Sequence, residues 1–336
     1  SILSYSVNIS QFENPMGGPD SAENYWTDSD NEASLESDWI DISDIGIPYS
    51  FSDNDESGSL INIGFDFPFY GEDYSQCIIN PNGWVGFGSD NDAWDNTSIP
   101  SSSAPRPAIF GFWDDLNPVN DQCNSYCSGN VYFYNDGEKF IISFNQVAHW
   151  WTNFENNYYD FQFILYPDGS IDLNYNSLEG YTNSATIGIQ NSDGSDGIQV
   201  AYDNNYLNEN LSLRFRKKPD WISISPSSGQ IEGGLSETLI VQVDATGLEN
   251  DFYEAYLSIG QGWEGLPISM LVSSNPALPG DINGDAQVNI QDIIFLINFI
   301  LDIEDPDSNQ FLSADMNGDS VLNIQDVILI VNSILG

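Results

Sequence analysis

Two short segments near the end of the chain carry oxygen-bearing side chains at regular intervals. The segments DINGDAQVNIQD (281–292) and DMNGDSVLNIQD (315–326) are two copies of one pattern, and each has Asp or Asn at positions 1, 3, 5, 9 and 12. This spacing is typical of an EF-hand-type loop, in which position 7 adds a backbone carbonyl oxygen. The predicted ligands are Asp281, Asn283, Asp285, Gln287, Asn289 and Asp292, then Asp315, Asn317, Asp319, Val321, Asn323 and Asp326. We expect one Ca²⁺ in each loop; the alternative is two Asx-rich turns that only cap helices.

Catalytic residues are hard to find elsewhere in the sequence. His149 is the only histidine, which excludes a zinc site built from several histidines. No Gly-x-Ser-x-Gly elbow marks a nucleophile. Asp114 and Asp115 could supply paired carboxylates for glycoside hydrolysis, but adjacent residues of a strand point to opposite faces, so we expect a calcium or turn role instead. The sequence predicts a protein that is not an enzyme.

Two further kinds of site stay open as alternatives. Trp150, Trp151, Tyr158 and Tyr159 surround a polar loop, TNFENN, and could stack on sugar rings or belong to the core of the domain. Three acidic loops are candidates for additional Ca²⁺ or are solvated turns; they span residues 53–56, 90–95 and 193–196.

The charge balance restricts the class of partner. The 336 residues include 51 Asp and Glu against 6 Lys and Arg, a net charge of −45, yet the 40% of hydrophobic residues is too high for a disordered acidic chain. Such a charge repels nucleic acid and anionic membranes, and the one basic cluster, 214–218, is too short to reverse it. No apolar run reaches the roughly 18–20 residues of a membrane-spanning helix. The first residues lack the features of a signal peptide, as expected of a trimmed mature chain or a cytosolic one.

The three cysteines leave the redox compartment open. Cys123 and Cys127 lie four residues apart in a polar stretch and could form a local disulfide, which would imply an oxidising compartment. Cys77 is expected to be a small buried residue.

Residues 1–216 consist of short apolar and aromatic runs separated by Asn, Asp, Gly, Ser and Pro. This texture predicts strands and tight turns, with hairpins at Asp136-Gly137, Asp168-Gly169 and Asp193-Gly194. Examples of the expected strands are 60–67, 84–87, 130–134, 140–147, 159–166, 170–175, 185–190 and 197–202. No helical period is visible, so we expect a mainly β chain that opens with a β-sandwich at 1–216.

Two parts of the chain resemble known β domains. The pieces FDFPFYGEDY, INPNGWVGF, PAIFGFWDDL, FQFILYPDGSIDLNY and ATIGIQNSDG, within residues 20–205, resemble a β-sandwich module of secreted bacterial surface proteins. Residues 217–274, with Trp221, the turn at 225–229 and DATGL at 244–248, resemble a small Ig-like spacer domain. A linker, SSNPALPG (273–280), follows it.

A C-terminal domain is expected at 275–336, and over about residues 279–336 it resembles the type I dockerin, a small α domain with two calcium loops that binds cohesin domains. Asp at position 12, the Asn-x-x-Asp ending of each loop and the lack of a helix before the first loop carry this resemblance. In the family, loop positions 10 and 11 help to select the partner; here they are Ile-Gln in both copies. Position 6, usually Gly, is Ala286 and Ser320, so we expect modest backbone strain there.

The apolar runs after the loops, 293–301 and 327–335, contain no Lys or Arg, and a helix apolar on most faces must be covered. We expect a calcium-dependent contact through Phe295 and Phe299, either with the Ig-like domain or with a neighbouring subunit, to which Ile2–Ile9 could add a strand.

The sequence therefore predicts a secreted calcium-binding surface or matrix protein, extracellular and bacterial. Its dockerin-like tail would assemble it with a cohesin-like partner or with copies of itself into an oligomer or filament. The alternative is a glycan- or protein-binding module that the same tail anchors to a cohesin-type receptor.

Overall fold

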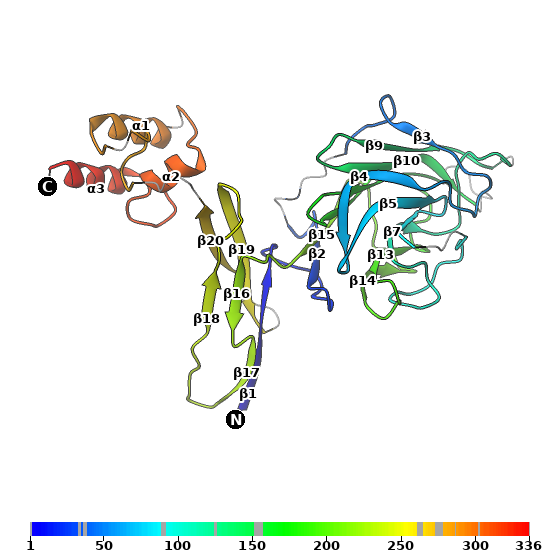
Figure 1. Ribbon diagram of the computed structural model, residues 1–336, viewed down its shortest axis with the longest axis horizontal. Helices are drawn as coiled ribbons and strands as arrows, with labels where there is room; N and C mark the ends of the chain where they lie inside the picture. The colour runs from blue at the N-terminus through cyan, green and yellow to red at the C-terminus, as the bar shows by residue number, and fades with distance from the viewer. Residues whose placement is uncertain are drawn as a thin grey trace. The chain divides into compact units, whose positions relative to one another are not determined.

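The computed structural model describes residues 2–32, 35, 39–88, 92–123, 126–150, 157–260, 265–272, 278–285, 287–301 and 303–335. The chain is mainly β, as predicted, with 42% of residues in strands and 9% in helices (Figure 1). It divides into two compact units, one of residues 10–219 and one that combines residues 1–9 with 220–336.

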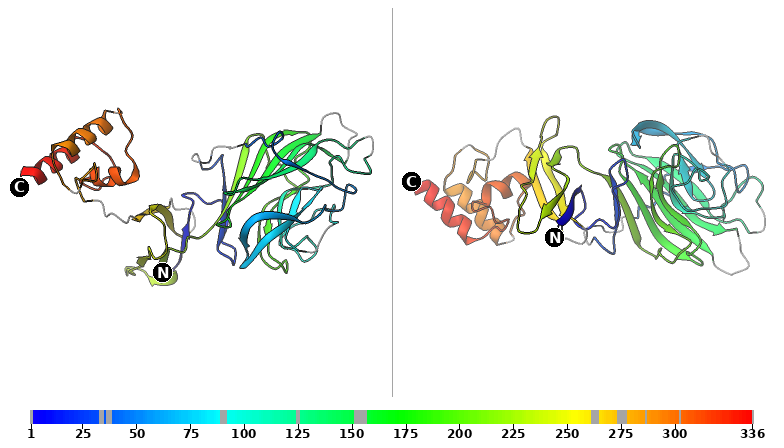
Figure 2. Two further views of the ribbon diagram at one scale, coloured as in Figure 1. Left: turned by 45° about the horizontal axis from the view of Figure 1, so that its top comes forward. Right: turned by 90° about the horizontal axis from the view of Figure 1, so that it is seen from below.

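The larger unit contains two antiparallel sheets, seen edge-on in Figure 2. One sheet has the order β2 (Asn24–Asp28), β15 (Leu211–Lys217), β12 (Ile171–Glu179), β11 (Tyr158–Leu165), β10 (Phe140–His149), β9 (Asn130–Asn135) and β3 (Ile47–Tyr49), and β8 (Leu116–Asn117) also pairs with β10. The other has the order β14 (Gly197–Tyr202), β13 (Thr186–Gln190), β7 (Ala108–Trp113), β6 (Trp84–Gly86), β5 (Glu72–Asn80) and β4 (Ile61–Phe69).

Aromatic side chains from both sheets fill the space between them. Phe112 of β7 stacks on Tyr159 of β11 with ring centroids 4.5 Å apart. The Tyr175 hydroxyl of β12 donates to the Gly111 carbonyl at 2.6 Å. A Cβ at Gly111 would lie only 2.5 Å from the Phe163 ring, so the close approach of the sheets requires glycine there. The predicted sandwich is thus the observed architecture.

The predicted hairpins are present. The Asp-Gly pairs at 136–137, 168–169 and 193–194 connect β9 to β10, β11 to β12 and β13 to β14, with each glycine at positive φ. All eight expected strands are formed, within a few residues at each end. Strands β2, β3, β5, β7, β8 and β15 of the same unit lie outside the expected ranges.

The basic cluster at the end of this unit is largely neutralised inside it. Arg214 donates to both carboxylate oxygens of Asp172 at 2.9 Å, and Arg216 donates to one of them at 3.0 Å. Burial raises the pKa of Asp172, but the two guanidinium groups outweigh it and hold that pKa below its ordinary value. Lys218 pairs with Glu23 at 2.6 Å. Arg214, Arg216 and Lys218 therefore form ion pairs inside their own unit.

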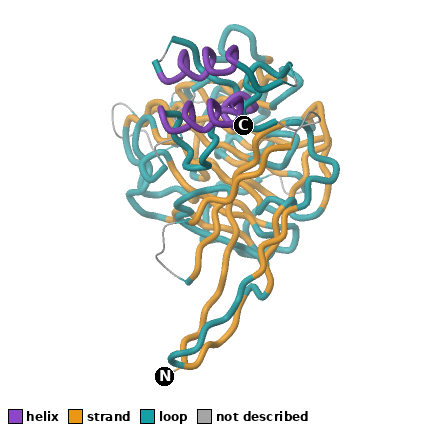
Figure 3. Tube along the Cα trace, turned by 90° about the vertical axis from the view of Figure 1, so that its left-hand side faces the viewer, coloured by secondary structure: helices purple, strands orange, loops and turns teal. Residues whose placement is uncertain are grey.

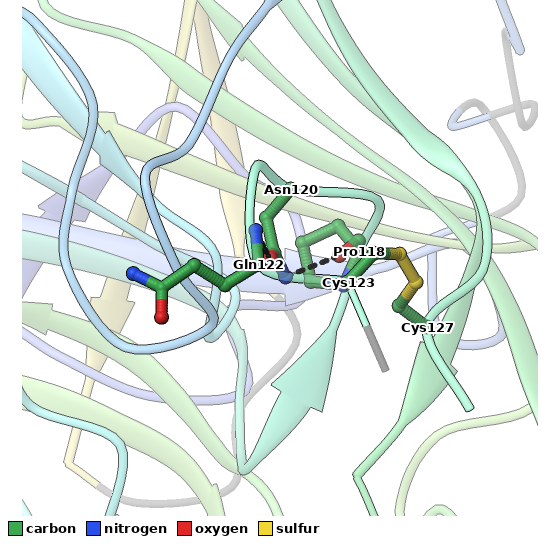
Figure 4. The surroundings of a disulfide bond; sticks show 5 residues. All are labelled: Pro118, Asn120, Gln122, Cys123 and Cys127. Carbon is green, nitrogen blue, oxygen red and sulfur yellow. Dashed lines mark hydrogen bonds between the residues drawn. A yellow bond between two sulfur atoms is a disulfide. The ribbon is translucent and has the colours of Figure 1, made fainter. Parts of the chain in front are cut away.

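Cys123 and Cys127 form a disulfide, with their Cα atoms 5.7 Å apart (Figure 4). The loop carrying them begins after β8, where the Asn120 side chain donates to the Pro118 carbonyl at 3.0 Å and accepts from the Gln122 amide at 2.9 Å. Cys77 is a free, fully buried thiol, as predicted, and burial raises its pKa.

The N-terminal strand, expected in the sandwich, pairs instead with a small β region formed by residues 220–272. β1 (Ile2–Ser10) lies between β17 (Ser228–Glu232) and β19 (Asp251–Ile259), and β20 (Leu266–Val272) completes that sheet. β16 (Ile222–Ser225) and β18 (Ile240–Val243) form a second, two-stranded sheet. Ile9 packs in one cluster with Trp221 and Ala255, so burial decides the pairing over proximity in sequence. The domain boundaries near 216 and 274 stay predictions.

Helices occur, among the described residues, only in the C-terminal part (Figure 3). They are α1 (Ile290–Ile300), α2 (Ser308–Ala314) and α3 (Ile324–Leu335). Leu296 and Phe299 of α1 pack with Ile330 of α3 in a small core. None of the helices described is long and apolar enough to cross a membrane.

Candidate functional site

The first loop is held by hydrogen bonds from its own backbone to the predicted ligand side chains. Asp292 Oδ1 accepts the amides of Ile282 and Asn283 at 2.8 and 3.1 Å, and its Oδ2 accepts that of Asn289 at 2.8 Å. The Asp285 amide donates to Asp281 Oδ1 at 3.1 Å. The side chains at positions 1 and 12 therefore accept backbone amides of the loop itself and hold its curled conformation.

The second loop repeats this network at the equivalent positions. Asp326 Oδ1 accepts the amides of Met316 and Asn317 at 3.0 and 3.3 Å, and its Oδ2 accepts that of Asn323 at 3.0 Å. The Asp319 amide donates to Asp315 Oδ1 at 3.2 Å. Equal sequence spacing has thus produced equal geometry.

Position 9 of each loop begins the following helix. Asn289 caps α1 by accepting the Gln291 amide at 2.8 Å, and with Asp292 it forms a capping box. Asn323 accepts the Gln325 amide at 2.8 Å in the same way. The helices therefore start at Ile290 and Ile324, three residues before the apolar runs at 293–301 and 327–335. Asn289 and Asn323 thus cap helices and also belong to the curled loops.

The two long helices expose apolar residues at equivalent positions of the repeat. In α1 these are Ile290, Ile294 and Ile297, which are 65, 54 and 40% exposed. In α3 Ile324 and Ile328 are 64 and 54% exposed. Phe299, one of the two rings expected at the contact, is instead buried in the helical core, and Phe295 is partly buried against it. We define the exposed apolar face as Ile290, Ile294, Ile297, Ile324 and Ile328.

Comparison with known proteins identifies two families in the chain. One family model, described as NIDO related, matches residues 33–232, which is more than half of the sequence. The chain belongs to the NIDO-related family. A second model, the dockerin type I domain, matches residues 279–335, where the paired loops lie. No curated protein and no solved structure matches the chain.

Both families consist of non-catalytic modules, and dockerin domains bind cohesin partners. The dockerin match confirms the resemblance that the loops predicted. The NIDO-related match covers the sandwich from residue 33, without β2, and reaches into the small β region. The likeness of that region to Ig-like domains stays a prediction.

The acidic side chains of the dockerin domain are suited to a hard cation. Residues 279–335 contain ten Asp and Glu and no Lys, Arg or His. Asp292 and Asp326 are fully buried, and a buried carboxylate without a cationic partner is costly. Within the described residues, no three His, Cys, Asp or Glu side chains gather closely enough to hold a metal by themselves. A Ca²⁺ would therefore need the Asn and carbonyl oxygens as well, as the predicted ligand set assumes.

The expected strain at loop position 6 is visible in the second copy. Ser320 has φ +61°, in the left-handed region. Ala286, its equivalent, lies outside the described residues. Gly284 and Gly318 at position 4 have φ +72° and +70°, so glycine supplies one sharp turn in each loop. The Asp-x-Asn-Gly start of each loop is the sequence signal for that turn.

A separate cavity of about 450 Å³ lies in the larger unit, residues 10–219, which we call the NIDO-related unit. It contains residues for which the sequence predicted no shared role. Asp114, Asp115 and His149 all line it. The two aspartates lie in a bend between β7 and β8, so the expectation that they point apart, which assumed a strand, is wrong. Trp94, Tyr181 and Ser184 also line the cavity and have no distinguishing spacing in the sequence.

The two carboxyl groups in this cavity differ in their environment. His149 Nε2 lies 3.2 Å from Asp114 Oδ2, and Ser184 Oγ donates to the same oxygen at 2.5 Å. Burial raises the pKa of Asp114, but the hydrogen bond and charge of His149 reverse this and leave it below its ordinary value. Burial, with nearby aspartates, raises the pKa of Asp115 to about 7.

The remaining candidate residues are those of the aromatic cluster and of the three acidic loops. Tyr159 is a core residue, whereas Trp150 is 41% exposed, and Trp151 lies outside the described residues. In the acidic loops, Asp53 and Asp193 accept amides of their own turns. The loop at 90–95 is described only from residue 92.

Proposed function

We propose that this protein is a calcium-stabilised assembly subunit that docks onto a cohesin-type protein through its dockerin domain. The observation that carries the proposal is the duplicated loop network followed by helices with equivalent exposed apolar residues. It rests on the family's known partner class and on the chemistry of the residues present.

In this proposal each loop holds one Ca²⁺, which supplies the positive charge that residues 279–335 lack. Asp281, Asp285 and Asp292 would contribute carboxylate oxygens in the first loop, with Asn283 and the Gln287 carbonyl completing an all-oxygen set. Asp315, Asn317, Asp319, Val321 and Asp326 would do the same in the second loop. Because Asp292 and Asp326 also cap α1 and α3, the ions would fix the start of both helices.

The partner surface follows from the exposed apolar face. Isoleucines and no basic residues occupy it, so the complementary surface on the cohesin-type domain would be apolar. Because the dockerin domain carries ten acidic residues, the partner residues around this apolar surface would be neutral or basic and not acidic. Because the face repeats in α1 and α3, either copy presents a similar set of side chains, including the Ile-Gln pairs at loop positions 10 and 11.

Localisation and the lack of catalysis are part of the same proposal. Dockerin-containing proteins are typically extracellular or on the cell surface, and the Cys123–Cys127 disulfide is consistent with an oxidising environment. The non-catalytic character of both matched families supports a binding and structural role.

The test uses the full chain and an immobilised type I cohesin domain, in Ca²⁺ and in EGTA. We expect binding in Ca²⁺ only. The double variant Ile294→Lys, Ile328→Lys should lose binding and keep calcium uptake, because both side chains are exposed. Leu235→Lys, which changes an isoleucine-sized residue that is 68% exposed in the small β region, is the matched control and should bind normally.

Two results would contradict the cohesin partner. One is a calcium-loaded, folded protein that no cohesin domain retains. The other is calcium-dependent self-association that the same double variant abolishes, which would identify a second copy of the chain as the occupant of the exposed apolar face.

A further inference from the structure

The cavity of the NIDO-related unit has the size and composition of a small-ligand site. Its volume of about 450 Å³ lies within the roughly 300–1,000 Å³ range of ligand pockets. Its walls come from four stretches far apart in sequence: 94–96, the 114–115 bend, the end of β10 with Asn157, and 181–184. The 114–115 bend follows β7, His149 ends β10, and residues 181–184 connect β12 to β13, so the cavity lies where these strands end.

The polar floor of the cavity is ordered by the surrounding structure. Asp114 is only 7% exposed and is fixed by His149 and Ser184. Asp115 lies beside it, and its backbone carbonyl accepts the Trp150 amide at 2.8 Å. A carboxyl whose pKa is about 7 can donate as well as accept a hydrogen bond near neutrality, as a ligand hydroxyl requires.

Two aromatic rings at the cavity are exposed although their backbones are anchored. Trp94 is 47% and Tyr181 is 52% exposed. The residue before Trp94, Ala93, accepts hydrogen bonds at its carbonyl from the buried indoles of Trp84 and Trp113, at 2.9 and 3.1 Å. The Tyr181 carbonyl accepts from the Tyr159 hydroxyl at 2.6 Å. Anchored backbones that present exposed rings beside a polar floor reduce the ordering cost of binding.

We propose that this cavity binds an uncharged saccharide, with Trp94 and Tyr181 stacking on the apolar face of a sugar ring and Asp114 and Asp115 hydrogen-bonding its hydroxyl groups. The described lining residues include no Lys or Arg, which disfavours an anionic ligand. An ammonium ligand would have to pair with Asp95 or Asp115, which also line the cavity, because Asp114 already faces His149. Such a ligand would leave the hydroxyl-binding groups of the floor unused, and the experiment below separates it from a neutral one. A neutral polyhydroxy ligand satisfies both the rings and the polar floor.

The experiment measures retardation of the full chain in native gels that contain a neutral polysaccharide. The panel is xylan, mannan, a mixed-linkage β-glucan and starch, and EGTA is present so that the result does not depend on the dockerin loops. We expect at least one polysaccharide to retard the parent. Trp94→Ala and Tyr181→Ala should each weaken that binding roughly tenfold or more, without a change in melting temperature, because both rings are exposed.

The matched control is Tyr126→Ala, which removes a ring that is 55% exposed outside the cavity and should bind as the parent does. The inference is overturned if none of the four polysaccharides retards the parent, or if both cavity variants bind as tightly as the control. It is also overturned if lysine or methylammonium, and no neutral sugar, changes the tryptophan fluorescence in a Trp94-dependent way.

Discussion

Loop position 6 shows how one residue can limit a binding loop. Ser320 is exposed and has φ +61°, and its amide donates to Asp315 Oδ2 at 2.9 Å. The backbone must adopt this conformation for the amide to point into the loop, but a residue with a Cβ is strained there. The sequence predicted this strain because the loop pattern fixes which position turns.

Replacing Ser320 with glycine should remove that strain. We expect Ser320→Gly to stabilise the dockerin domain by about 1 kcal/mol and to raise the calcium affinity of the second loop. Chelator-dependent thermal melts and calorimetry measure both effects. Ser320→Ala keeps the Cβ and serves as the control; equal behaviour of the glycine and alanine variants would contradict the explanation.

Asp115 is a residue whose burial opposes folding. Its pKa rises from an ordinary 3.8 to about 7 in the folded chain, chiefly through burial. Above pH 7 the group is ionised in both states and the burial penalty is fully expressed; below about pH 4 it is protonated in both and the penalty disappears. Between these limits the folded state binds more protons, so this group's contribution to stability falls as pH rises.

Asp115→Asn should therefore stabilise the NIDO-related unit by more than about 1 kcal/mol at pH 8, and the gain should shrink towards zero near pH 4. Denaturant unfolding at several pH values measures this difference. The exposed Asp121 provides the control, since Asp121→Asn should give no such trend. A stabilisation that does not depend on pH would show that burial of the charge is not its cause.

Among the secondary-structure elements, the hairpin turns could be predicted from short local motifs. Asp-Gly pairs placed three hairpins correctly, because each needs positive φ at its glycine. The position of β1 could not be predicted, since its alternating pattern specifies a strand but not its partner. Its pairing depends on burial against a region that the whole sandwich separates from it in the sequence.

The cavity depends on a similar long-range effect. A bulge in β10, between Phe144 and Val147, has Gln146 at φ +53°, and both oxygens of Asp160 hold that residue. An extra residue shifts which face each later side chain occupies, including His149. Periodicity alone therefore could not bring His149 to Asp114.

The pairing of β1 predicts an asymmetric response to two substitutions. Val7→Asp places a charge where the parent side chain is 6% exposed, so it should destabilise the small β region by about 2–4 kcal/mol. Leu3→Asp, on the same strand but at 66% exposure, should have little effect. Amide exchange in residues 220–260 of the full chain measures both. Equal protection in the two variants would mean that β1 does not hold that region together.

For the whole molecule, the net charge of −45 means that the few basic residues and the cations of the solvent must offset many acidic side chains. The NIDO-related unit contains all six basic residues and neutralises some buried acids itself, through pairs such as Asp172 with Arg214. The dockerin domain has no basic residue, so in the proposed function its buried carboxylates take their counter-charge from Ca²⁺ in solution. This difference predicts that chelation destabilises the dockerin domain before the sandwich, as protease digestion in EGTA would show.

Calorimetric titration of Ca²⁺ into the EGTA-stripped, dialysed full chain measures whether each loop holds one ion. We expect Asp292→Asn and Asp326→Asn each to bind one ion fewer than the parent, because each removes the position-12 carboxylate of one loop. Asp305→Asn, an exposed acid between the loops, should bind as many ions as the parent. Absence of calcium uptake by the parent, or unchanged uptake in both loop variants, would show that these loops are not calcium sites.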